Sequence, residues 1–516
     1  MPAASTATAP EASDEPLMST GRLALFSVGA MAAMLLSLLD ENIVATAALP
    51  ITSDLDPEHG MSLLPWLLSV YLLAATATQP LYGKLSDLFG PKKVYLFAIV
   101  TFMAGSALCG LAQNMGQLIA FRAVQGLGGG GLMSLTLIIM ATLYPPKERA
   151  GGSGVGGGLV ALGIIVGPLL GGYLSQHLSW RWIFYVNLPL GLLTVVATLF
   201  ALRLPPRAHQ RERRVDLPGA ALVTAAAAGL LLIAQWGGTE YAWSSPQILG
   251  LSAGSLLLVA AFAWWETRAA EPILPPSLFR DPVFRIAAPL QFLAGFTVLA
   301  VTAYVVTYLQ VARGLSAQSA GQRLAPMAIG VIVVMFSSGK LISRTLRYKP
   351  VLLLNSAITV VTLALFGTVD ETTSALHLGV LLVLLGFGLG GVVQVVLQTV
   401  QASAPPEQLG VATTGTRFFM TLGSGFGVAV LGELLNNRFL ALLPDGVPES
   451  ARGSAGKAVA ALRTAPPELR DKLTHAYASA VDTVFLTAAG LMLLALVLAF
   501  LMPDVRLGAA DEQEAA

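Results

Sequence analysis

The stretch GKLSDLFGPKK, residues 83–93, returns in altered form as GKLISRTLRYK at residues 339–349. Both copies start with Gly-Lys-Leu, end on basic residues and follow an apolar segment long enough to cross a bilayer. Internal repeats of this kind are typical of transporters built from two related halves. The spacing predicts six transmembrane helices in each half, with two inserted helices between the halves.

The composition agrees with a membrane protein. Of the 516 residues, 55% are hydrophobic and 11% are charged, whereas soluble chains are about 25% charged. We therefore predict an all-α polytopic membrane protein with 14 transmembrane helices. The predicted spans lie near residues 23–48, 62–82, 93–112, 116–142, 152–175, 182–202, 216–236, 246–266, 284–310, 320–340, 350–369, 376–400, 409–435 and 480–501.

The distribution of Lys and Arg orients these helices. Of the 30 basic residues, 19 fall in short segments on the side of the N-terminus and three in short loops on the other side. The positive-inside rule then makes both termini cytoplasmic. The predicted domains are a disordered cytoplasmic tail (1–20), an N-terminal six-helix bundle (21–203), a linker with two inserted helices (204–283), a C-terminal six-helix bundle (284–503) with a long extracytoplasmic loop (436–479), and a cytoplasmic tail (504–516). An amphipathic stretch, residues 462–477, predicts a short surface helix in that loop.

Several classes of protein are disfavoured. The net charge of +1 gives no basis for nucleic-acid binding. The five His residues fall in or beside predicted loops, the only Cys is Cys109, and no His, Cys or carboxylate cluster has metal-ligand spacing. No GxSxG or Walker pattern occurs, and the GxGxxG-like run Gly126–Gly131 lies inside an apolar segment, where it indicates helix packing. We expect neither an enzyme nor a metal or organic cofactor.

Two adjacent acids, Asp40 and Glu41, interrupt the first apolar segment in SLLDENIVATAALP (37–50). A carboxylate at the bilayer centre costs about 2.5–3.5 kcal/mol on insertion scales. Asp40 lies about 12 Å and Arg122 about 9 Å from the outer ends of their predicted helices. These depths allow a pair between the first and fourth helices. A static ion pair and acids exposed to a wet vestibule are the structural alternatives to a proton-carrying role.

Five motifs in order resemble the major facilitator superfamily, specifically its fourteen-helix drug:proton antiporter branch. They are LDENIVATAALP (39–50), GKLSDLFGPKK (83–93), LIAFRAVQGLGGG (118–130), GIIVGPLLGGYL (163–174) and WRWIFYVNLPLG (180–191). Two departures stand out. The first motif has one residue more than the family pattern, and Pro91 replaces a usual Arg.

The resemblance implies roles for particular residues. It implies a major facilitator fold and favours Asp40 as the main proton carrier, tuned by Arg122, with Glu41 as a second carrier or a cation contact. It implies a conformational latch in which Asp87 docks at the start of the thirteenth helix. The latch residues are Gly83, Asp87, Gly90, Lys92 and Lys93, and those of the antiporter motif are Gly163, Gly167, Pro168, Gly171 and Gly172.

The expected activity is export of amphipathic, cationic drugs or toxic compounds by proton antiport through alternating access. The alternative is proton-coupled export of a lipid, a siderophore or another metabolite. Partners would be the substrate, protons and membrane lipids, the energy source the proton motive force, and the location the bacterial inner membrane, with the chain acting as a monomer. Candidate cavity residues are Met34, Gln291, Phe292, Tyr304, Tyr308, Gln394, Gln398 and Arg417.

Overall fold

The structure is a computed structural model, and its described residues are almost entirely helical. Described are residues 19–56, 60–144, 163, 166–167, 170–175, 177–204, 216–238, 240–315, 317–370, 372–405, 407–444, 447, 459 and 466–505. An isolated β-bridge joins Gly237 and Tyr241. The predicted all-α class is therefore confirmed for these residues, while both predicted tails fall almost wholly outside them.

The helices form three groups along the chain. The first contains α1 (Thr20–Thr46), α2 (Ala48–Leu55), α3 (Gly60–Phe89), α4 (Pro91–Leu111), α5 (Met115–Leu143), α7 (Trp182–Tyr185) and α8 (Asn187–Phe200). The second contains α9 (Leu217–Trp236) and α10 (Pro246–Glu266). The third contains α11 (Pro276–Arg280), α12 (Pro282–Val311), α13 (Ala317–Gln322), α14 (Ala325–Thr345), α15 (Lys349–Phe366), α16 (Ala375–Ser403), α17 (Leu409–Ala441) and α19 (Pro467–Leu501).

Twelve helices of the described chain are long and apolar enough to cross a membrane. They correspond to twelve of the fourteen predicted spans. Of the other two, residues 62–82 lie in the 30-residue helix α3, and most of residues 152–175 lie outside the described part. The long apolar run after Gln408 forms one helix, α17. The protein is thus a multi-pass membrane protein, and the count of fourteen stays a prediction.

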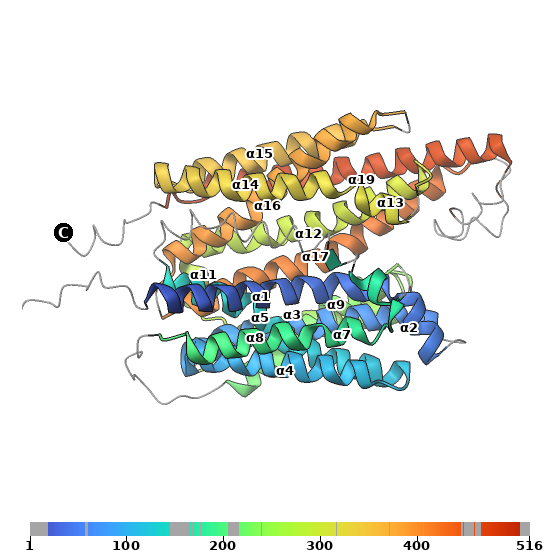
Figure 1. Cartoon of the computed structure of the whole chain (residues 1–516). Helices are drawn as coiled ribbons and strands as arrows, with labels where there is room; N and C mark the ends of the chain where they lie inside the picture. Colours follow the sequence, from blue (N-terminus) through green and yellow to red (C-terminus); the bar gives the residue numbers. More distant parts are fainter. Residues whose placement is uncertain are drawn as a thin grey trace, which may run out of the picture.

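The first and third groups form two bundles that lie side by side (Figure 1). In one bundle α5 packs on α3 and α4, and α1 packs on α8; in the other α12 packs on α17 and α19, and α16 on α14 and α15. Helices α9 and α10 pair with each other, and α9 also contacts α3 and α17. The described chain begins and ends at the same end of the bundles (Figure 1), which we call the terminal face; the other end is the distal face.

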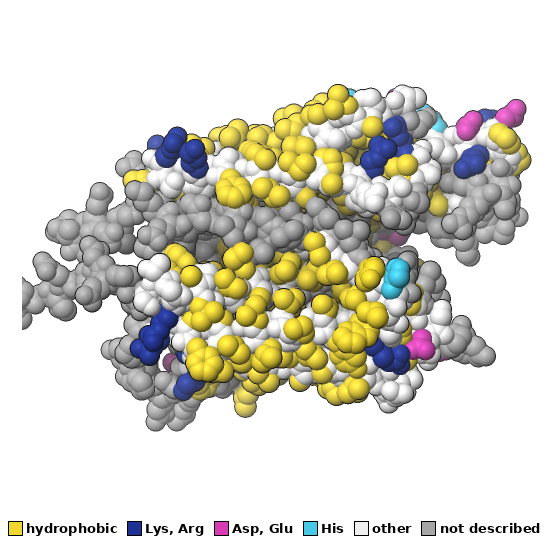
Figure 2. Space-filling view, viewed as in Figure 1, with side chains coloured by type: hydrophobic (Ala, Val, Ile, Leu, Met, Phe, Trp, Pro, Cys, Tyr) yellow, Lys and Arg dark blue, Asp and Glu magenta, His cyan; other side chains and the backbone are white. Residues whose placement is uncertain are grey.

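The surface of the described helices suits a bilayer. Apolar side chains cover the middle of the molecule, and Lys and Arg side chains gather near its two ends (Figure 2). Exposed apolar residues of α8 and α10 include Phe200, Leu256 and Leu257, each at least 69% exposed. In water such a surface would be unfavourable, so lipid tails are its natural solvent.

The repeated stretches each place a residue of positive φ in the turn, at the same position of the repeat. In the first copy, α3 ends at Phe89 and α4 begins at Pro91, with Gly90 between them at a φ of 87°. Leu346 occupies the matching position of the second copy and has a φ of 56°. A left-handed conformation is uncommon for residues other than Gly. Pro91, the departure from the family motif, takes the first helical position, where a missing N–H costs little.

The predicted loop at residues 436–479 is too long. Helix α17 continues to Ala441, and α19 starts at Pro467. The stretch predicted as a separate surface helix therefore merges with the last membrane helix from residue 467 onward. Pro467 and Glu468 are favourable in a first helical turn, and Tyr477 packs edge-on against Phe439 with ring centroids 5.2 Å apart. This contact holds the polar extension of α19 against α17.

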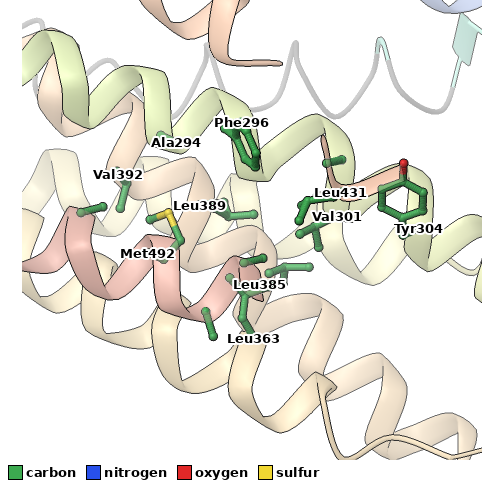
Figure 3. Packing of buried hydrophobic residues seen from close by; sticks show 14 of the residues in the cluster. Ala294, Phe296, Val301, Tyr304, Leu363, Leu385, Leu389, Val392, Leu431 and Met492 are labelled. Carbon is green, nitrogen blue, oxygen red and sulfur yellow. The ribbon is translucent and has the colours of Figure 1, made fainter. Parts of the chain in front are cut away.

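Helix–helix contacts in the second bundle depend on glycine. A Cβ placed on Gly295, Gly423 or Gly427 would overlap a backbone carbonyl of the facing helix, so α12 and α17 approach with no side chain between them. Small residues permit such close approach in membranes. Beside this contact, apolar side chains from α12, α15, α16, α17 and α19 interdigitate (Figure 3).

We predict that Gly427→Ala destabilises the protein, because the new methyl group would overlap the carbonyl of Phe296. The expected loss is about 1–3 kcal/mol, as for other overpacked cores, measured by unfolding in detergent. Gly254→Ala in α10 is the matched control, because a Cβ there meets no atom within 4 Å. Equal stability of the two variants would contradict this account of the packing.

Candidate functional site

Asp40 and Arg122 form a buried ion pair between α1 and α5. The Nη1 of Arg122 lies 2.6 Å from Oδ2 of Asp40. The Asp40 side chain has no exposed surface and that of Arg122 is 2% exposed. The structure thus brings together the two residues whose predicted depths matched. Helix α1 continues past both acids to Thr46, so they do not end the helix; the side chain of Glu41 lies outside the described part.

Two amides complete the surroundings of the Asp40 carboxylate. Gln125 Nε2 donates to Oδ1 at 2.7 Å, and Asn187 Nδ2 donates to the same oxygen at 3.0 Å. Both amides also donate to Ser106 Oγ, at 3.2 and 3.0 Å, and Ser106 donates to the carbonyl of Phe184. Within the described part of the chain, every atom that hydrogen-bonds to the Asp40 carboxylate is a donor. Such an arrangement is suited to a carboxylate that carries its charge.

Besides its bond to Asp40, the guanidinium of Arg122 contacts Gln125 and Tyr71. Nη1 also donates to Gln125 Oε1 at 2.9 Å. The guanidinium carbon lies 4.2 Å from the ring centroid of Tyr71 on α3, a cation–π contact. The thiol of Cys109 is 3.6 Å from Gln125 Oε1. The site therefore connects α1, α3, α4, α5 and α8.

The segment from Trp180 to Asn187, which contains α7, contacts α1 and the following helix α2 at two separate places. Trp180 Nε1 and Arg181 Nη1 both donate to Oδ2 of Asp54, at 2.9 and 2.7 Å, and these bonds lower the pKa of Asp54. Seven residues after Trp180, Asn187 reaches Asp40. The motif WRWIFYVNLPLG thus contacts both the buried acid and the short helix that follows α1.

Ser106, Gln125 and Asn187 were not predicted as site residues. Gln125 could have been found, because it lies three positions after Arg122 and so shares its helix face. Asn187 belongs to a motif that was recognised only as a family signature. Ser106 had no signal, since a single Ser in an apolar helix is usually satisfied by its own backbone.

Asp87 of α3, for which the resemblance implies a latch role, contacts the start of α17. Its Oδ2 accepts from the backbone N–H of Val411 at 3.1 Å. The first N–H groups of a helix lack internal partners and favour an anion. A Cβ on Gly83 would overlap Thr414 Oγ1, so α3 and α17 touch closely one turn away. Together these contacts join the two bundles at the terminal face.

The basic residues of the same motif have separate contacts. Lys84 forms an ion pair of 2.6 Å with Glu271, in the segment after α10. Lys92 Nζ donates to the carbonyls of Leu199 and Leu202, at 3.0 and 2.7 Å, at the end of α8. Lys93 is exposed. Lys84 thus links α3 to the inserted pair, and Lys92 links α4 to α8.

The described part of the antiporter motif faces α1. A Cβ on Gly163 would come within 2.6 Å of Cβ of Leu38, two residues before Asp40. Gly167 and Gly171 are buried, whereas a Cβ on Gly172 would meet nothing within 4 Å. Pro168 lies outside the described residues, so its predicted kink stays a prediction.

Three of the predicted cavity residues donate to backbone carbonyls. Gln291 Nε2 donates to Val393 O at 2.9 Å, Tyr304 to Val428 O at 2.7 Å, and Tyr308 to Asp370 O at 2.7 Å. Tyr308 thus fastens the segment after α15, and the cavity role of all three residues stays a prediction. Of the remaining candidates, Met34 and Gln398 are buried, and Phe292, Gln394 and Arg417 are partly buried.

In the described part of the chain, no group of three or more His, Cys, Asp or Glu residues could hold a metal ion. The chemistry that the site offers is instead that of one acid, one permanent cation and their hydrogen-bond partners. A carboxyl group of this kind can bind and release a proton, whereas Arg keeps its charge throughout the accessible pH range.

We predict an asymmetry between the two halves of the ion pair. Removing one partner of a buried pair costs about 3–5 kcal/mol. In Arg122→Gln the Asp40 carboxyl can lose its charge by binding a proton, whereas in Asp40→Asn the guanidinium cannot. The loss of stability in Arg122→Gln should therefore shrink between pH 7 and pH 5, and that in Asp40→Asn should not.

Unfolding in detergent at both pH values measures these differences. The double variant is the control, and its loss should be smaller than the sum of the two single losses. A pH-independent loss in Arg122→Gln would contradict the prediction.

The chain matches the profile of the Major Facilitator Superfamily over residues 30–428. It is 36% identical to the multidrug transporter protein MdtP of Bacillus subtilis, over 82% of this chain and 77% of that protein. It is 31% identical to multidrug resistance protein 3 of the same organism, over 93% of this chain and 95% of that protein. In fold it resembles the human organic anion transporter MFSD10, with a TM-score of 0.64 and 17% identity, over 93% of this chain and 100% of that chain. It also resembles the proton:xylose symporter XylE, with a TM-score of 0.61 and 14% identity, over 96% of this chain and 98% of that chain. The family and these relatives are transporters rather than enzymes, and this chain belongs to the Major Facilitator Superfamily.

Proposed function

We propose that the protein exports amphipathic, cationic drugs or toxic compounds by proton antiport through alternating access. The observation that carries the proposal is the buried pair of Asp40 and Arg122. Ion pairs inside a membrane protein are costly, and they commonly mark proton or substrate pathways. The names of the bacterial relatives, which are multidrug transporters, favour drugs as the cargo.

Asp40 is the proposed proton carrier. Its carboxylate has donors on both oxygens, so the deprotonated form is well accommodated in this conformation. A conformation that moves Arg122 away would leave the charge without its cation and favour protonation. Alternation between the two arrangements would bind a proton on one side of the membrane and release it on the other.

The contact between α3 and α17 is the proposed inner gate. The positive-inside pattern places the terminal face in the cytoplasm, and at that face Asp87 binds Val411 N–H. This arrangement corresponds to a transporter closed toward the cytoplasm. Opening would require Asp87 to leave α17 and the two bundles to separate there.

The proposed substrate class is based on acidic residues in the first helix and on an adaptable aromatic surface. Acids in the first helix favour a cationic substrate. Phe292 is partly buried, and its ring centroid lies 6.3 Å from that of Phe296 and 6.2 Å from that of Phe426, so these rings offer an adaptable apolar surface. A bacterial inner membrane would supply the proton motive force, and one proton crossing 100 mV yields about 2.3 kcal/mol. We expect a monomer that has protons, substrate and lipids as its partners.

We predict that Asp40→Asn abolishes proton coupling, because the amide cannot carry a proton in exchange for substrate. The measurement is internal pH in proteoliposomes under an imposed pH gradient, upon addition of a panel of cationic dyes. Glu41→Gln is the comparison that separates the two adjacent acids. Unchanged dye-driven proton flux in Asp40→Asn would remove Asp40 from the mechanism.

Absence of flux in folded wild-type protein with every dye would overturn the cationic-drug proposal. The same assay with a lipid, a siderophore or another metabolite would then test the alternative cargo.

We predict that Asp87→Asn opens the terminal face more often, because an amide loses the charge that the N-terminus of α17 attracts. Spin labels at Arg203 and Glu407, both exposed at that face on opposite bundles, would report the separation in a Cys109→Ala background. The expected result is a larger population at long distance in Asp87→Asn. Glu271→Gln, which breaks only the contact of Lys84 with the inserted pair, is the control; identical distance distributions in Asp87→Asn and wild type would refute the latch.

A further inference from the structure

Asn187 has an unusual position beside Asp40. The side chain is fully buried. Its Nδ2 donates to Asp40 Oδ1 and to Ser106 Oγ, both at 3.0 Å. Its Oδ1 is also buried, yet it has no hydrogen-bond partner among the described residues. An unpaired buried acceptor costs about 1–3 kcal/mol, so this atom needs an explanation.

Among the described residues, none of the groups bonded to Asp40 offers an acceptor for a proton. In the present arrangement its two oxygens face Arg122 Nη1, Gln125 Nε2 and Asn187 Nδ2, which are all donors. A protonated carboxyl is itself a donor and needs an acceptor nearby. If Asp40 binds a proton inside the bundle, at least one neighbour must change its role.

Asn187 is the neighbour that can change at the lowest cost. Arg122 has donors only. The Oε1 of Gln125 already accepts from Arg122 and from Cys109, so turning that amide would break both bonds. Ser106 gives its proton to Phe184 O. A half-turn of the Asn187 amide breaks one bond outside Asp40, the bond to Ser106 Oγ. It exchanges one unpaired buried group for another and brings the amide oxygen to the place of Nδ2, 3.0 Å from Asp40 Oδ1.

We propose that Asn187 is a positioning residue that serves both charge states of Asp40. Its amide donates to the carboxylate, and after a half-turn its Oδ1 accepts the hydrogen bond of the protonated acid. The inference rests on the proposed function in taking Asp40 as the proton carrier. The proton comes from solvent and stays on Asp40 Oδ1; Asn187 gains and loses none, and Arg122 keeps its charge.

Few ionisable groups lie near Asp40 and Asn187 in the described part of the chain. They are Arg122 on α5, Tyr71 on α3, whose ring lies under the guanidinium, and Cys109 on α4, which contacts Gln125. Glu41, the next residue in the chain, has a side chain outside the described part. Of these groups only Arg122 bonds directly to Asp40, so the amide orientation of Asn187 responds to Asp40 itself.

Infrared difference spectroscopy as a function of pH tests the inference without transport. Asp40→Asn identifies the carboxyl band of Asp40, and asparagine labelled with ¹³C in its side-chain carbonyl, compared with Asn187→Leu, identifies the amide band of Asn187. Asn355 is a matched control in the other bundle, because it is 1% exposed and its Oδ1 also has no partner. It donates to Ser338 rather than to a carboxylate.

We expect the Asn187 amide band to shift with the same pH midpoint as the Asp40 acid band, and Asn187→Leu to move the acid band to higher wavenumber. Asn187→Leu should change the proton affinity of Asp40 by about fivefold or less, because both charge states lose one bond to Asp40 and the charged state also loses the neutral bond to Ser106. Asn355→Leu should leave the Asp40 band unchanged.

A pH-independent amide band, together with a rise in proton affinity of about tenfold or more in Asn187→Leu, would overturn the inference, because Asn187 would then be a donor only. If Asp40 shows no acid band in folded wild-type protein, the inference and the proton carrier both fail. If the bands behave as expected but no dye drives proton flux, the cationic-drug proposal fails and the role of Asn187 stands.

Discussion

The charge of Asp40 is buried among apolar helices, and this constraint fixes how the first bundle is assembled. Removing a carboxylate from water costs several kcal/mol unless cations and donors replace the lost hydration. The replacements come from α5, in Arg122 and Gln125, and from α8, in Asn187. Because hydrogen bonds tolerate errors of only a few tenths of an ångström, these helices cannot slide along α1 without leaving a buried polar atom unpaired.

Glycine makes that precision possible. Gly126 lies one residue after Gln125, and a Cβ there would come within 2.5 Å of Tyr71 O, so α5 packs directly on the backbone of α3. On α4, Gly105 faces the backbone of Gln125 in the same way and lies beside Ser106. Gln125 and Ser106 are thus each next to a glycine that brings its helix close. Larger residues at these positions would separate the donors from Asp40.

Much of the fold and part of the candidate site could be predicted from the sequence. The contacts that were missed have physical reasons. The pair of Asp40 and Arg122 was predictable, because depth in a membrane helix follows from counting residues. The partners of Tyr304 and Tyr308 were not, since a helix that is apolar on all sides gives no sign of which face meets a carbonyl of its neighbour. The start of α19 was missed because its polar first turns extend beyond the apolar span, and hydropathy detects lipid contact rather than helix length. Asn187 was visible within a motif, but the turn between α7 and α8 decides where its amide points.

Helix α3 contributes to both the proposed proton site and the proposed gate. Tyr71 lies under the guanidinium of Arg122 near the middle of the helix, and Asp87 binds the start of α17 at the C-terminal end of α3. The two residues are sixteen positions apart, about 24 Å along a rigid helix. A helix cannot bend freely over that length, so a movement of Tyr71 that follows Arg122 is transmitted to Asp87 as a tilt or a shift. Under the proposed function, this geometry lets the charge state of one carboxyl bias the contact that joins the two bundles, with no chain of intermediate side chains required.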